Sequence, residues 1–533
     1  MTDTFDYVVV GAGSSGSVCA AKLAERGASV LLLEQGDRAE DNPETLRADG
    51  YKDAFINDRL MIERFSTPQR GCGGRRIFLG SGKGAGGSGA INAMVYTRGS
   101  REDFDAWGPG WRWGDVVPHF EAVERVLDVR RREPTDFTEA CIQAAVENGF
   151  RRKDDLNDGD LSRVLGYEWM NFRGNERRNS YVSFLKDASP VNVTLRTGAC
   201  VRRVLFDRDK RAIGVEYEVG GAATVARARA EVVLAAGALE TPRLLQLSGI
   251  GPGSRLAALG VPVVAHSPEV GENLHDHPNV TTFFRARRDV DCHYPQLYGF
   301  LRLGAGRTGA SEAAAGEPDA CLVFYPARSS LREGMMRMIP AMVLPASVHA
   351  DGRAPRAIRS VIGALFDRGA VERFVRRVWG VVVILGKPKS RGSVRIVSPD
   401  YTAPAAIDPA YFAEAGDFEV MLRGVELARR IAGSPGVASF GATELMPGPM
   451  GRSEAGVGAF IRNNSMTTYH YAGTCGFGDG AETVTDRQLA VRGVQALRLA
   501  DASVMPVAPV AALNAPSMMI GHRAAQFAVE ASR

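Results

Sequence analysis

A glycine-rich turn between a short strand and a helix is the feature that most constrains how this chain folds. Residues 7–10 form an apolar run, and the turn Gly11-Ala-Gly-Ser-Ser-Gly16 follows directly. Residues 18–26 have the pattern of a helix, and residues 29–33 that of a second buried strand, which leads to Glu34. This order of strand, glycine turn, helix and strand predicts the first unit of a doubly wound α/β fold.

The residue types in this turn suit a dinucleotide. Gly11 permits a tight turn, Gly13 lets backbone N–H groups approach a pyrophosphate, and Gly16 lets the helix pack closely on the strand. Glu34 comes 18 residues after Gly16, close to the offset at which a carboxylate accepts ribose hydroxyls. A glycine turn that binds no nucleotide is the alternative, but the flanking strand and helix favour the dinucleotide site.

Length and composition restrict the class of protein further. The 533 residues are enough for two large, interleaved domains, and Lys and Arg outnumber Asp and Glu by only four. This charge balance gives no indication of a nucleic-acid partner. Seven scattered cysteines without a C-x-x-C pair indicate neither a metal site nor a disulfide framework. Because the N-terminus also lacks the charge and apolar run of a signal peptide, we expect a cytoplasmic protein with reduced thiols.

Further elements are predicted along the chain. Strand patterns lie within residues 194–237 and again at residues 497–501, and apolar spacing predicts a long closing helix at residues 514–530. Residues 302–317 are rich in Gly and Ala, so we expect a mobile loop there. Together these patterns predict an α/β core with inserted β-rich material.

Five further motifs give a family resemblance. The chain resembles the glucose-methanol-choline (GMC) oxidoreductases, a family of FAD-dependent alcohol dehydrogenases and oxidases, over most of residues 4–290 and 380–530. The motifs are the glycine-rich segment Gly80 to Gly99, Gly237 to Gly251, Val270 to Pro278, Ala500 to Pro506, and Asn514 to Gly521. The resemblance implies a Rossmann-like FAD-binding domain interleaved with a substrate-binding domain built on an antiparallel sheet with helices.

The resemblance also implies a division of the chain. Residues 1–290 would form an N-terminal module, mainly FAD-binding, and residues 291–384 a variable substrate or lid region. Residues 385–533 would form a C-terminal module that carries the catalytic His and returns to the FAD domain.

The same resemblance assigns residues to FAD. The ADP half would lie on the first glycine turn and Glu34, the pyrophosphate and flavin edge on the second glycine segment, and the ribityl and phosphate portion on Asp501 and Ala502. Ile91 stands where some members attach FAD covalently through a His, so we expect non-covalent FAD. The implied cofactor residues are Gly11, Gly13, Ser14, Ser15, Gly16, Glu34, Gln35, Gly82, Gly87, Ser88, Asn92, Ala93, Val201, Ala236, Asp501, Ala502 and Pro516.

His470 is the candidate general base, since a neutral imidazole can take a hydroxyl proton. It resembles the family's catalytic His, although Tyr471 replaces the Pro that usually follows. Asn514 matches the position of a second family residue, which hydrogen-bonds the substrate oxygen; alternatively it caps the closing helix. His275 and His277 are interpreted as structural.

The predicted activity is FAD-dependent oxidation of the CH–OH group of a small alcohol, with O2 or an electron carrier as acceptor. Alternatives are an oxidase of a biosynthetic intermediate, a lyase or decarboxylase on the same fold, and a non-catalytic flavoprotein. Residues 353–377 carry seven Arg and helical apolar spacing. Such a stretch is compatible with weak contact with a membrane surface, with a redox partner or acidic substrate, or simply with a solvated charged face.

Overall fold

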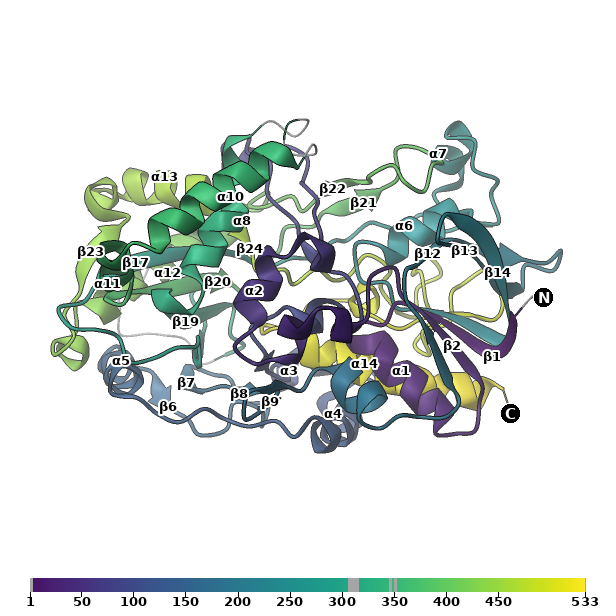
Figure 1. Ribbon diagram of the computed structural model, residues 1–533, viewed down its shortest axis with the longest axis horizontal. Helices are drawn as coiled ribbons and strands as arrows, with labels where there is room; N and C mark the ends of the chain where they lie inside the picture. Colours follow the sequence, from purple (N-terminus) through teal and green to yellow (C-terminus); the bar gives the residue numbers. More distant parts are fainter. Residues whose placement is uncertain (1–2, 305–315, 345–347, 349–351, 533) are drawn as a thin grey trace.

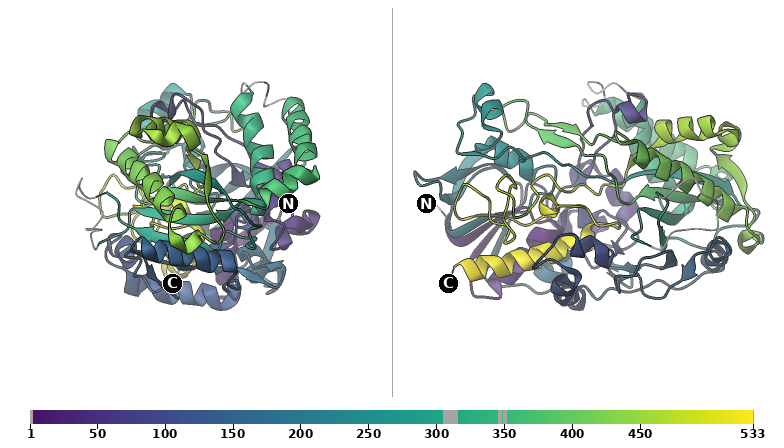
Figure 2. Two further views of the ribbon diagram at one scale, coloured as in Figure 1. Left: turned by 90° about the vertical axis from the view of Figure 1, so that its left-hand side faces the viewer. Right: turned by 180° about the vertical axis from the view of Figure 1, so that it is seen from behind.

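A computed structural model describes residues 3–304, 316–344, 348 and 352–532. Two large sheets lie toward opposite ends of the long axis, and both chain termini lie at the end that holds the first sheet (Figures 1 and 2). The fold is mixed α/β, as predicted. Residues 305–315, most of the predicted mobile loop, lie outside the described residues.

The first sheet contains the predicted N-terminal unit. Its strand order is β11-β2-β1-β14-β13-β12, with β25 also paired to β14. Strands β1, β2, β11, β14 and β25 pair in parallel, whereas β12 and β13 add antiparallel strands at one edge. The strands are β1 (Asp3–Val10), β2 (Val30–Leu33), β11 (Val193–Arg196), β12 (Ala199–Phe206), β13 (Ala212–Val219), β14 (Ala222–Leu234) and β25 (Leu497–Leu499).

Helices α1 (Ser14–Ala24) and α14 (Asn514–Ala531) pack against each other beside this sheet (Figure 1). Their contact requires a glycine, because a Cβ at Gly521 would lie 2.3 Å from the carbonyl oxygen of Ser15. Helix α1 begins at Ser14, four residues before the predicted start, since the chain becomes helical immediately after the glycine turn. The N-terminal and C-terminal ends of the sequence therefore form one layer.

The second sheet has the order β23-β17-β20-β19-β18-β7-β6, with β24 also paired to β17. It is antiparallel apart from the β6–β7 pair. Its strands are β6 (Arg151–Arg152), β7 (Val164–Tyr167), β17 (Pro278–Arg285), β18 (Leu297–Leu301), β19 (Ala320–Pro326), β20 (Val378–Leu385), β23 (Thr443–Met446) and β24 (Met466–Thr467). Helix α12 (Ala415–Ala432) covers one face of it.

Three helices form the middle region: α8 (Leu331–Val343), α10 (Arg353–Phe366) and α11 (Gly369–Val375). The other helices are α2 (Tyr51–Ile56), α3 (Arg101–Asp105), α4 (Trp113–Leu127), α5 (Asp136–Glu147), α6 (Thr241–Leu247), α7 (Gly253–Ala258) and α13 (Glu454–Asn464). Short strands complete the chain: β3 (Met61–Ile62), β4 (Ser81–Gly82), β5 (Val95–Tyr96), β8 (Trp169–Met170), β9 (Phe172–Arg173), β10 (Glu176–Arg177), β15 (Ile250–Gly251), β16 (Ala265–His266), β21 (Ser393–Arg395) and β22 (Ala406–Asp408).

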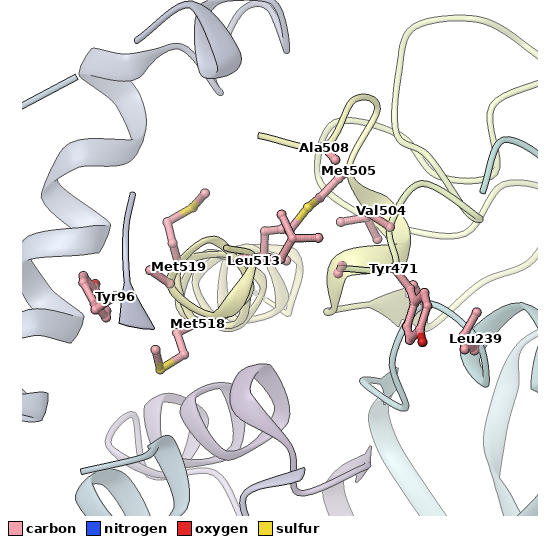
Figure 3. Close-up of a cluster of buried hydrophobic side chains, with 14 of the residues drawn as sticks. Tyr96, Leu239, Tyr471, Val504, Met505, Ala508, Leu513, Met518 and Met519 are labelled. Atoms are coloured by element: carbon pink, nitrogen blue, oxygen red, sulfur yellow. The ribbon is translucent and has the colours of Figure 1, made fainter. Parts of the chain in front are cut away.

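The main hydrophobic core extends across the junction between the two sheets. Met518 and Met519 of α14 and Leu513 just before it belong to the same buried cluster as Tyr471 and Leu239 (Figure 3). The segment around Tyr471 is therefore anchored in the core that supports the first sheet.

Candidate active site

The two glycine segments pack backbone against backbone. A Cβ at Gly16 would lie 1.9 Å from the oxygen of Gly11, whose φ is +101°. Gly87 has φ +52°, and a Cβ on it would lie 2.8 Å from the Cα of Gly13. A Cβ at Gly82 would lie 2.4 Å from the carbonyl group of Gly87. Side chains are therefore excluded here, which leaves main-chain N–H groups to face a ligand.

The Glu34 carboxylate holds these segments together. It is buried and accepts N–H bonds from Ala12 at 3.0 Å, Gly36 at 2.9 Å and Gly84 at 3.0 Å. Burial raises the pKa of Glu34, and the three amide donors oppose that shift. Two carboxylate oxygens provide about four acceptor positions, so one position remains for a ligand hydroxyl. The adjacent Gln35 is exposed.

Asp501 fixes the segment after β25. Its carboxylate accepts the N–H of Gly237 at 2.9 Å and the hydroxyl of Thr241 at 2.5 Å. It also accepts the N–H of Ser503 at 2.8 Å, which caps the short helical turn that begins at Ala502. These bonds join the segment to the residues that follow β14, where Ala236 lies.

Arg177 supports the second glycine segment and was not identified from the sequence. Its guanidinium is 0% exposed and donates to the oxygen of Gly89 at 3.0 Å. It also donates to Asn92, at 2.8 Å to the side-chain Oδ1 and at 2.7 Å to the carbonyl oxygen. All of these acceptors are neutral, and burial lowers the pKa of Arg177 to about 9. Arg177 therefore fixes Asn92 with a buried charge that has no carboxylate partner among the described residues.

Two histidines from distant parts of the chain contact each other. The Nδ1 atoms of His470 and His277 are 3.0 Å apart, and the rings are nearly perpendicular. Burial lowers the pKa of His470 to about 4 and that of His277 well below its usual value. Both imidazoles are thus neutral near pH 7, and one Nδ1 must donate a proton to the other. His277, interpreted from the sequence as structural, contacts the candidate base directly.

Asp276 orients this pair through the backbone. Its Oδ1 accepts the N–H of His470 at 3.0 Å and that of His277 at 2.9 Å, and the hydroxyl of Tyr411 donates to Oδ2. Burial raises the pKa of Asp276 to about 6. Tyr471 adds a further link, because its hydroxyl donates to the oxygen of Gly80 at 3.4 Å. The residue in place of the usual Pro thus connects the histidine segment to the second glycine segment.

Asn514 lies beside the glycine segments. Its Oδ1 accepts the hydroxyl of Ser14 at 2.7 Å, and a Cβ on Gly89 would lie 3.4 Å from that oxygen. Its Nδ2 is enclosed without a hydrogen-bond partner within the described residues. The helix-capping alternative is wrong: Leu513 occupies the N-cap position, and Asn514 is the first helical residue. No hydrogen bond joins the described Asn514 and His470 side chains, so a shared catalytic role stays a prediction.

The remaining predicted cofactor residues are distributed around the same segments. Ser15 donates to the oxygen of Ala500, and Ser88 accepts the N–H of Gly82 at 3.0 Å. Ala93 packs on a small cluster of buried apolar side chains, Val201 lies half-buried in β12, and Pro516 is buried in the first turn of α14.

These features fit an FAD molecule. The glycine backbones leave a cradle without side chains, Glu34 keeps an acceptor position, and the amide of Asn514 is a donor without an acceptor in the described structure. A metal centre has no comparable support, since no cluster of His, Cys, Asp and Glu that could hold an ion occurs within the described residues.

Comparison with known proteins identifies the class. Models of the N- and C-terminal parts of GMC oxidoreductases match residues 5–279 and 388–521. The chain belongs to the GMC oxidoreductase family, and it is an FAD-dependent oxidoreductase that acts on CH–OH donors.

Particular relatives extend over nearly the whole chain. An uncharacterised GMC-type oxidoreductase of Mycobacterium tuberculosis is 33% identical over 98% of both chains. An oxygen-dependent choline dehydrogenase of Rhizobium etli is 32% identical over 98% of this chain and 94% of its own. The crystal structure of pyridoxine 4-oxidase from Mesorbium loti has a TM-score of 0.83 at 26% identity, covering 98% of each chain.

Among the described residues, no helix is both long enough and apolar enough to cross a bilayer.

Proposed function

We propose that the protein oxidises a small alcohol by taking the hydroxyl proton on His470 while the carbinol hydride is removed. The observation that carries this proposal is the buried His470 imidazole, 3.0 Å from His277, in a segment that Tyr471 links to the second glycine segment. Two relatives, named as a choline dehydrogenase and a pyridoxine 4-oxidase, support an alcohol as the substrate class.

Several residues of this chain have separate roles in the proposed reaction. His277 accepts the Nδ1 proton of His470, which leaves the Nε2 lone pair of His470 free to take a proton from the alcohol. Asp276 fixes the backbone of both histidines. Asn514 donates a hydrogen bond through Nδ2, either to the substrate oxygen or to the cofactor.

FAD, when bound, supplies the hydride acceptor. Gly13, Gly87 and Glu34 would hold its phosphates and ribose, and Asn92, fixed by Arg177, would lie at the flavin edge. Because Ile91 has no nucleophilic atom, the cofactor would be held without a covalent bond. Either O2 or an electron carrier would then accept the electrons. A cytoplasmic location stays a prediction from the sequence.

The middle region would control access to this site. Tyr469, next to His470, packs edge-on against Phe55 at 6.1 Å, and its hydroxyl lies 4.0 Å from the sulfur of Met338 in α8. Arg337 of α8 and Arg359 of α10 both pair with Asp58 and Glu63, which precede the second glycine segment. We therefore assign residues 291–384, through α8 and α10, to a cover over the substrate side. Residues 1–290 would form the mainly FAD-binding module, and residues 385–533 the module that carries His470 and returns to the FAD domain.

Anaerobic mixing of the purified protein with a panel of alcohols tests the proposal. Loss of the oxidised flavin absorbance should follow substrate addition, and His470→Ala should slow it by ~10²- to 10⁴-fold while FAD occupancy stays unchanged. Asn514→Ala should slow it less, since the base remains. Equal rates for His470→Ala and wild type would refute His470 as the base. Product formation without flavin bleaching would instead identify a lyase or decarboxylase.

A further inference from the structure

A pocket lies away from the residues assigned to FAD and to the base. It has a volume of about 680 Å³ and is lined by Tyr51 and Lys52 of α2, Arg132, Phe172 of β9, Tyr294, and Ser329. A volume of this order accommodates a small organic molecule.

The charges around this pocket are unequal. Five lining residues are cationic, namely Lys52, Arg130, Arg131, Arg132 and Arg328, and three are acidic, namely Asp49, Glu133 and Asp291. One charge of each sign is paired outside the pocket: Asp49 pairs with Arg47 at 3.1 Å, and Arg130 pairs with Asp128 at 2.7 Å. The pocket therefore has an excess of positive charge.

Arg132 is the central cation. Its guanidinium carbon lies 3.3 Å from the ring centre of Tyr294 and 4.1 Å from that of Phe172, so the group is held between two aromatic faces. Its Nε and Nη2 atoms are enclosed and have no acceptor within the described structure. Arg98 shows the usual alternative, since its Nε and Nη2 donate to the carboxylate of Glu124 at 2.7 and 2.6 Å.

Ser329 adds a hydroxyl group to the pocket lining. This residue is 3% exposed. Enclosed polar groups without partners are rare in folded proteins because each loses its hydration without compensation. The two enclosed N–H groups of Arg132, at a cavity with excess positive charge, favour an anionic ligand.

We propose that this pocket binds a small organic anion, a carboxylate or phosphate carried on a flat or apolar group. The guanidinium of Arg132 would face the anionic group, with Lys52 and Arg328 adding charge, and the aromatic side chains would contact the rest of the ligand. Tyr294 and Phe172 also pack on the cluster that contains Ala93 and Met94 of the second glycine segment. Anion binding at this pocket can therefore be tested whether or not the protein oxidises an alcohol.

Calorimetric titration of the FAD-loaded protein tests the pocket. Benzoate and inorganic phosphate are the anionic probes, and benzamide is the neutral isostere of benzoate. Wild type should bind benzoate saturably and benzamide at least about tenfold more weakly. Arg132→Gln should weaken benzoate binding about tenfold or more, because a charged hydrogen-bond partner is lost. Lys52→Gln should weaken it by a smaller factor.

The control is Arg208→Gln, which removes the same charge from an exposed turn and should leave benzoate binding unchanged. Thermal unfolding of each variant checks that it is folded. The proposal is overturned if neither anion binds saturably, if benzamide binds as tightly as benzoate, or if folded Arg132→Gln and Lys52→Gln both bind benzoate like wild type.

A kinetic comparison then separates two sources of the anion, both consistent with the site. If the anionic group belongs to the alcohol substrate, benzoate should compete with that alcohol and Arg132→Gln should raise its KM with little change in kcat. If it belongs to a separate metabolite, benzoate should still bind in the presence of saturating alcohol.

Discussion

Lowering the pH tests directly whether His470 is neutral in the folded protein. Burial lowers the pKa of this imidazole to about 4, from an ordinary value near 6.5. At pH 5 a group with a pKa of about 4 is about 90% neutral, whereas one with a pKa of about 6.5 is only about 3% neutral. If neutral His470 takes the proton, flavin reduction at pH 5 should therefore keep about nine-tenths of the rate at pH 8.

The assay is stopped-flow flavin reduction at saturating alcohol, with each protein normalised to its own rate at pH 8. Asp276 is the second group that titrates in this range, because burial raises its pKa to about 6. Asp276→Asn removes this titration, and the amide oxygen can still accept a backbone N–H. In that variant the normalised rate should stay nearly constant down to pH 5.

A fall to about 3% of the pH 8 rate in both wild type and Asp276→Asn would refute the reasoning, because it would mean that His470 has an ordinary pKa. This nearly flat pH profile differs from the simpler expectation from residue type alone, a rate that rises with pH through about 6.5. Burial of the imidazole against a second neutral imidazole is the physical reason for the difference.

Three further predictions concern the cofactor. Glu34→Ala should lower FAD retention and the unfolding temperature more than Gln35→Ala, because it leaves three backbone N–H groups without their acceptor at about 1–3 kcal/mol each; equal flavin content in both variants would contradict this. Arg177→Gln should lower FAD occupancy, measured by absorbance. Arg177→Lys should restore part of that occupancy, because it keeps the charge but not the planar guanidinium. Full occupancy in Arg177→Gln would exclude a supporting role. Acid precipitation should release free flavin into the supernatant, since Ile91 cannot bond to it, and flavin retained on the pellet would show a covalent link.

Much of the first sheet could be predicted because its signals are local. The run at residues 7–10, the glycine turn and the run at residues 29–33 each determine their own conformation, and β1, α1 and β2 follow in that order. Tertiary packing decides other boundaries: β14 begins at Ala222, in an Ala- and Arg-rich stretch, because it pairs with β13 there.

Individual site residues could be proposed from the sequence only where they belong to a recognisable motif. His470 and His277 are 193 residues apart, and Arg177 and Asn92 are 85 apart, so no spacing rule connects either pair. Their contacts arise because β17 begins just after His277 and β24, just before His470, pairs with its first residues. Arg177 belongs to a short hairpin with no catalytic signature, and its importance depends on complete burial against neutral oxygens, a property that becomes visible only in three dimensions.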